Sequence, residues 1–85
     1  MREIPVCTDN WNGKHDEVFI WHNPDSTTEV TISEVASPWP FTLPSPIQIP
    51  AGAKRQCGLG STPGRCHYNS SPCTTKGNPK TVIIA

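Results

Sequence analysis

The fold is decided by residues 17–35, which read EVFIWHNPDSTTEVTISEV. Residues 17–21 are mostly β-branched or aromatic, a composition typical of strands. Residues 23–26, Asn-Pro-Asp-Ser, predict a turn, because proline presets φ and aspartate bonds its own backbone. In residues 27–35 apolar and polar side chains alternate, which predicts a second strand with one solvent-exposed face. We expect the two strands to form a β-hairpin.

The rest of the chain also divides into short extended runs separated by turn residues. Ten prolines are spread along the 85 residues, and each would break the interior of a helix. Further strands are expected at residues 47–50, 53–59, 65–69 and 81–84. Residues 8–16 and 70–80 are polar and turn-rich, and are expected to be loops. The pattern predicts a small all-β Greek-key sandwich of about seven short strands, in a single domain over residues 1–85.

A proline-rich segment separates the two halves of this pattern. Residues 38–46 contain four prolines among nine residues and cannot form a central strand, since proline donates no ladder hydrogen bond. We expect an extended crossover whose large side chains, Trp39, Phe41 and Leu43, pack into the core. The alternative is a polyproline segment that presents these side chains to a protein partner, as in a protease-inhibitor-like or effector module.

Four cysteines in a chain of this size are typical of a small domain stabilised by disulfides in an oxidising compartment. Cys57 and Cys66 flank the turn residues 60–64, and if these residues close a hairpin the two cysteines face each other. The remaining pair is then Cys7 with Cys73. Free thiols and a zinc site are the alternatives, although the cysteines lack the close spacing of zinc ligands.

Seven basic and seven acidic side chains give a formal net charge of zero. This balance disfavours nucleic-acid binding and a polybasic membrane anchor, and no apolar run is long enough to span a bilayer. All seven acidic residues lie at or before Glu34, whereas most bases follow it. We expect these charges to pair or to face solvent; the alternative is a dipolar surface that orients a partner. Residues 1–5 show no apolar leader, so an extracellular or periplasmic location is expected from cysteine usage alone.

Three segments resemble the strands and turns of cupredoxins, the plastocyanin-like copper proteins. Residues 18–25 resemble the V-x-W-x-N-x-D strand and turn of that family, and residues 46–52 resemble its P-x-x-I-x-V-x-A-G element. Residues 63–73, followed by 82–84, resemble its P-G-x-Y-x-Y-x-C hairpin and terminal strand. The first two segments occur in the reverse of the family's usual order. The resemblance implies a cupredoxin-like outline for the sandwich.

The resemblance does not extend to the copper ligands. A type 1 site needs two imidazoles, one thiolate and a weak axial methionine. Thr27, Thr28 and Glu29 stand where the family has its first histidine, and residues 74–78 contain neither the second histidine nor the methionine. Cys73 alone corresponds to a ligand. The resemblance therefore implies the scaffold without the metal, and no cofactor is expected.

The remaining patterns favour a non-catalytic role. The chain has no nucleophile–base motif and no paired carboxylates, so an enzyme is not expected. A different copper site, built from His22, His67 and Cys73, is an alternative.

The favoured interpretation is a secreted or cell-envelope module that acts by binding or in a structural role. Loops 22–28 and 70–80 would form its partner-facing end, because loops on a rigid scaffold usually carry recognition. Its partner would be an unidentified protein, and the chain is expected to be a monomer.

Overall fold

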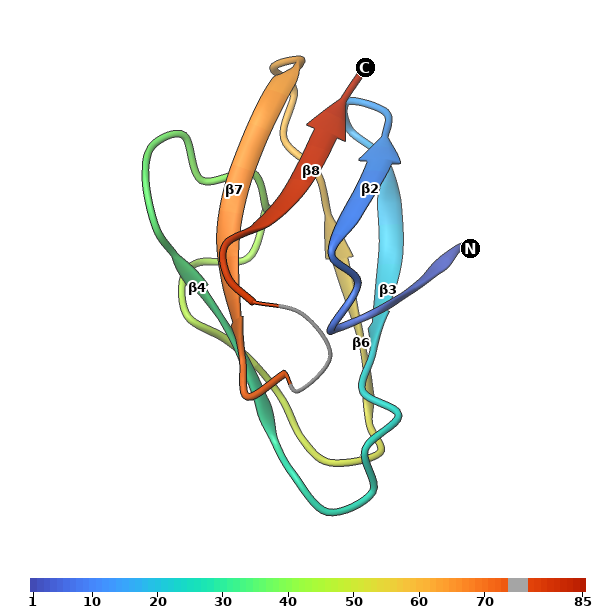
Figure 1. Ribbon diagram of the computed structural model, residues 1–85. Coiled ribbons are helices and arrows are strands. Elements are labelled where there is room, and N and C mark those ends of the chain that lie inside the picture. Colours follow the sequence, from blue (N-terminus) through green and yellow to red (C-terminus); the bar gives the residue numbers. More distant parts are fainter. Residues whose placement is uncertain (74–76) are drawn as a thin grey trace.

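The computed structural model describes residues 1–73 and 77–85, and in this part of the chain eight strands form two sheets. The first sheet has the order β1-β3-β6, formed by Glu3–Pro5, Val18–His22 and Lys54–Gly58. The second has the order β2-β8-β7-β4-β5, formed by Asn10–Gly13, Lys80–Ile84, Gly64–Ser71, Val30–Glu34 and Ile47–Ile49. The two sheets face each other (Figure 1) and enclose one apolar core, which confirms the expected small all-β sandwich.

Aromatic side chains fill the space between the two sheets. Phe19 and Trp21 are fully buried, because they alternate along β3 with residues that face outward. Trp21 contacts four other rings at centroid distances between 5.0 and 6.0 Å: Phe19, Phe41, Trp11 and Tyr68. These contacts are edge to face, the arrangement that ring quadrupoles favour. The aromatic cluster is therefore the centre of the core.

Tyr68, the only tyrosine of the chain, has its hydroxyl inside this cluster. The hydroxyl accepts a hydrogen bond from Trp11 Nε1 at 2.8 Å. Burial raises the pKa of Tyr68 well above its ordinary value of 10.0; the charge of Asp9 adds to this shift, and the bond from Trp11 opposes it. Because the raised pKa belongs to the folded state, the resulting stability is complete below pH 10 and is lost as the pH rises toward the folded pKa.

This burial predicts an unusual alkaline titration. In the folded protein we expect no tyrosinate absorbance near pH 10, and we expect it to appear only together with cooperative unfolding at higher pH. The chain unfolded in guanidinium serves as the control and should titrate at the ordinary value. Tyrosinate that forms near pH 10 while the near-ultraviolet circular dichroism of the fold persists would contradict the buried position of Tyr68.

Two N-terminal strands are present that the sequence does not predict. β1 runs parallel to β3 and β2 runs parallel to β8, so the N-terminal segment pairs with both sheets (Figure 1). Residues 8–16 are therefore not one continuous loop: Trp11 of β2 is buried, and the turn-forming Asn12 and Gly13 end that strand. Pairing with β8 overrides the local turn preference, since strand formation depends strongly on tertiary context.

The prediction of a hairpin over residues 17–35 is wrong. Its two strands form as β3 and β4, but β3 belongs to one sheet and β4 to the other. Trp21 of β3 and Ile32 of β4 are both fully buried and belong to the same core. Alternation along a strand specifies which face is buried, and it leaves the neighbouring strand undetermined.

The prediction of a hairpin across residues 60–64 is also wrong. The disulfide predicted between Cys57 and Cys66, which depended on that hairpin, is wrong for the same reason. β6 pairs with β3, whereas β7 pairs with β4 and β8, so the 60–64 turn crosses from one sheet to the other. Cys57 and Cys66 are buried free thiols. The disulfide joins Cys7 to Cys73, which are 66 residues apart in the chain.

Thiol chemistry can check this pairing. We expect reduction to break the one disulfide, so that the mass rises by two hydrogens rather than four. In native buffer Cys57 and Cys66 should resist iodoacetamide, because both are buried and because burial raises the pKa of the Cys66 thiol. In denaturant both should react. A gain of four hydrogens, or complete alkylation of the folded protein, would contradict the structure.

Candidate functional site

Asn23 fixes the first of two loops that meet at one end of the sandwich. Its side chain is fully buried. The amide nitrogen donates to the carbonyl oxygens of Thr28 at 2.8 Å and Ile49 at 3.1 Å, and Oδ1 accepts a bond from Asp25 N at 3.1 Å. These bonds close residues 23–28 into a compact turn and hold it against the end of β5. The loop is thereby ordered by a buried and fully bonded side chain.

Asp25 shapes the exposed tip of the same loop. Its Oδ1 accepts hydrogen bonds from Thr27 N at 2.8 Å, Thr27 Oγ1 at 2.9 Å and Thr28 N at 3.2 Å. These bonds, that from the Thr27 backbone first, lower the pKa of Asp25 below its ordinary value of 3.8. The backbone carbonyl of Asp25 accepts a hydrogen bond from the backbone N of Gly52 at 2.8 Å. Gly52 has a φ of +69°, a conformation that favours glycine. The loop therefore presents a carboxylate that is ionised at neutral pH.

The second loop follows β7 and is held by Ser70 and the disulfide. Ser70 is fully buried, and its Oγ donates to the carbonyl oxygen of Val6 and lies 3.3 Å from Cys73 Sγ. The side chain of Asn78 accepts from Ser70 N at 3.0 Å and donates to Ser70 O at 3.2 Å, as a neighbouring strand would. With the bond between Cys7 and Cys73, these contacts join the loop to the segment between β1 and β2.

A cavity of about 350 Å³ lies between these two loops. Apolar groups supply most of its wall, namely Val6, Pro24, Val30, Pro72 and the sulfurs of the disulfide. Asp25 and Thr28 add polar groups. We call this space the loop-end cavity. Its size falls at the lower end of the range of about 300–1,000 Å³ that small-molecule and cofactor pockets occupy.

The expected partner-facing loops, 22–28 and 70–80, both contribute to the loop-end cavity. Residues 74–76 of the second loop lie outside the residues that the structure describes. The sequence marks the first loop by its turn residues and the second by Cys73. It gives no signal for the contribution of Val6 and Val30, because their place at the cavity depends on how the sheets meet.

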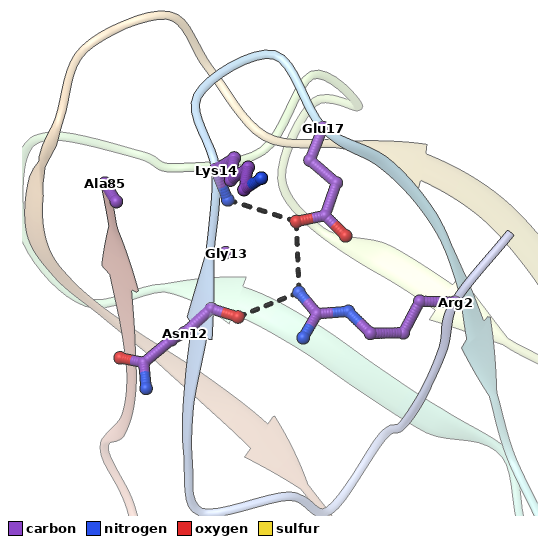
Figure 2. A pocket seen from close by; sticks show the side chains of 6 residues that line it. All are labelled: Arg2, Asn12, Gly13, Lys14, Glu17 and Ala85. Carbon is purple, nitrogen blue, oxygen red and sulfur yellow. Dashed lines mark hydrogen bonds and ion pairs between the residues drawn. The ribbon is translucent and has the colours of Figure 1, made fainter.

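A second pocket, of about 440 Å³, lies between Arg2 and the end of β2, with Glu17 beside them (Figure 2). Arg2 Nη2 donates to Asn12 O at 2.8 Å and to Glu17 Oε1 at 3.0 Å. The same Glu17 oxygen accepts a bond from Lys14 N at 3.0 Å, and the Arg2 guanidinium lies 5.6 Å from the centre of the Trp11 ring. In this seam pocket, which is lined by Arg2, Asn12, Gly13, Lys14, Glu17 and Ala85, the charges of Arg2 and Glu17 are thus paired with each other.

Ion pairs join the acidic first part of the chain to the basic second part. Lys54 Nζ lies 3.0 Å from Glu3 Oε2, and the fully buried Lys80 has its Nζ 3.8 Å from Asp9 Oδ1. The charge separation along the sequence is therefore partly cancelled in the fold. These contacts agree with pairing and weaken the case for a dipolar binding surface.

The structure does not bring His22, His67 and Cys73 together. His22 lies in β3 of one sheet, 3.7 Å from the carboxylate of Glu3. His67 lies in β7 of the other sheet, with Nδ1 at 3.1 Å from Thr81 Oγ1. The sulfur of Cys73 is bonded to Cys7 and supplies no thiolate. Among the described residues there is no group of three or more His, Cys, Asp or Glu side chains placed to hold a metal ion.

The expected extended crossover over residues 38–46 is wrong, because the segment leaves β4, bends against the end of β6 and returns to β5, the antiparallel neighbour of β4 in the same sheet. Backbone hydrogen bonds of 2.9 Å join Thr42 to Gly58 and Pro40 to Gly60. The three large side chains do not form an exposed face: Phe41 is buried, and Trp39 and Leu43 pack, partly buried, against the core. Trp39 Nε1 also donates to Leu43 O at 2.7 Å. A partner could reach only part of this segment.

No family model matches the chain, and comparisons with curated proteins and with solved structures likewise find no match. In the described part of the chain no helix is long and apolar enough to cross a membrane. The geometry of the loop-end cavity is therefore the main basis for a functional interpretation.

Proposed function

We propose that the chain is a non-catalytic β-sandwich module that binds a protein partner at the loop-end cavity. The observation that carries this proposal is the cavity itself, which lies between residues 23–28 and residues 70–73, two segments that contacts within the fold hold in place. Asn23 holds one loop, and the bond between Cys7 and Cys73 holds the other. A site that is ordered in advance avoids the entropy cost of ordering loops on binding.

The proposal includes an extracellular or periplasmic location and a cupredoxin-like outline. A disulfide between partly exposed cysteines supports an oxidising compartment, where such bonds persist. The outline is supported by the positions of the motif segments, since residues 18–25 and 46–52 each supply one strand and the turn that follows it. Cys73, which would correspond to a copper ligand, instead closes the cavity through its disulfide.

Selection of peptides from a random displayed library on the immobilised protein tests the binding site. We expect enriched peptides to bind the wild-type protein and to lose binding to Thr28→Trp, which places a large side chain at the cavity. Lys14→Trp is the matched control, because it adds the same side chain at the seam pocket, and it should bind as the wild type does.

Thermal denaturation of both variants establishes that each is folded before binding is measured. Failure to enrich any peptide, or peptides that bind Thr28→Trp as well as wild type, would overturn the proposed site.

A further inference from the structure

The two pockets differ in how their carboxylates are neutralised. In the seam pocket, Glu17 is paired at 3.0 Å with the guanidinium of Arg2 (Figure 2). In the loop-end cavity, the hydrogen bonds that Asp25 receives from the described residues come from the neutral groups of Thr27 and Thr28. Within the described residues no lysine, arginine or histidine lines this cavity. The loop-end cavity therefore combines an apolar wall with a negative charge that the described chain does not balance.

The hydrogen bonds of Asp25 also orient the carboxylate. All three bonds go to Oδ1, and in the described part of the chain Oδ2 receives none. Since the turn fixes Oδ1, Oδ2 remains available to an incoming donor at the edge of the cavity. Asp25 is ionised at neutral pH, so such a donor gains most if it carries a positive charge.

We propose that the loop-end cavity binds a lysine or arginine side chain presented by the protein partner. The aliphatic stem of that side chain would lie along Val6, Pro24 and Pro72, and its cationic head would pair with Asp25 Oδ2. Basic side chains suit such a place, because they bury an apolar stem while the charged end stays near solvent. This inference rests on the proposed function and specifies the chemistry of the partner.

A matched pair of small probes tests the inference. N-acetylarginine amide carries the cation, and N-acetylcitrulline amide has nearly the same shape without charge. We expect the arginine probe to shift the backbone amide signals of residues 23–28 and 70–73 in heteronuclear NMR spectra, with a Kd of about 1 mM as suits a ligand of this size. The citrulline probe should bind about two- to fivefold more weakly.

Two variants locate the charge that the probe recognises. Asp25→Asn keeps an Oδ1 acceptor for the turn and removes the charge, so binding of the arginine probe should weaken about fivefold. Asp16→Asn removes the same charge beside Ser61, outside the residues that line the cavity, and should leave binding unchanged.

Three results would overturn the inference: equal binding of the two probes, signal shifts outside the cavity, or equal effects of the two variants. Library peptides that require the cavity but contain no basic residue would also overturn it, and they would leave the proposed binding site intact. Peptides that fail at the cavity altogether would remove the proposed function itself.

Discussion

Replacing Cys7 and Cys73 by serine is expected to lower the free energy of unfolding by about 4 kcal/mol. The bond closes a loop of 66 residues, and in the chain-entropy model a loop of that length strongly restricts the unfolded chain. The expected fall in Tm is about 15–30 °C, since 1 kcal/mol shifts Tm by about 4–8 °C in a domain of this size. Differential scanning calorimetry of the oxidised wild type and the double serine variant measures the difference.

The matched control for this prediction is Cys57→Ala with Cys66→Ala, which removes the two free thiols and keeps the disulfide. A reductant should lower the Tm of the wild type and of this control by similar amounts, and it should have no effect on the double serine variant. A double serine variant that melts within a few degrees of the oxidised wild type would show that the disulfide contributes little to stability.

Truncating Trp21 to alanine is expected to lower the free energy of unfolding by about 3–5 kcal/mol. Trp21 is fully buried and contacts four rings, so its removal leaves a large cavity at the centre of the core. A domain of 85 residues has a total stability of only about 4–13 kcal/mol, so this variant can be largely unfolded. Urea denaturation followed by circular dichroism gives the value.

Trp21→Phe keeps the prediction testable if the alanine variant does not fold. Trp21 Nε1 has no hydrogen-bond partner among the described residues, so phenylalanine costs some packing and breaks no hydrogen bond. Trp11→Phe is the comparison for Trp21→Phe, because it makes the same replacement but removes the donor of the hydrogen bond to the Tyr68 hydroxyl, which is 2.8 Å long. We expect Trp21→Ala to be much less stable than Trp21→Phe. Equal stability of these two variants would contradict the central position of Trp21.

The strands were predictable from the sequence to the extent that side-chain alternation defines them. Residues 18–22 and 30–34 form strands as their patterns predict, and residues 47–49 and 80–84 do so too. The partners of these strands were not predictable, because apolar faces on opposite walls of one core have the same alternating pattern as neighbours in one sheet. This ambiguity explains why two hairpins were expected where the chain crosses between sheets.

The candidate site was predictable in its parts but not in its assembly. Asn23, Pro24 and Asp25 are residues typical of a turn. Cys73 is one of only four cysteines in the chain, so it has few possible disulfide partners. Two features of Asn23 depend on contacts between segments that are distant in the sequence. These are the burial of its side chain and the hydrogen bond from its amide to Ile49 of β5. The short strand at residues 10–13 was missed for the same reason, since its ladder is supplied by β8.

The parallel pairing of the N-terminal strands bears on solubility. β1 pairs with the outer side of β3, and β2 pairs with the outer side of β8. One short segment therefore supplies an edge strand of each sheet. Proteolytic loss of residues 1–13 would replace these edges, three and four residues long, by the rows of backbone donors and acceptors of β3 and β8, each five residues long. Such rows recruit strands from other molecules, and the clipped protein is therefore expected to aggregate.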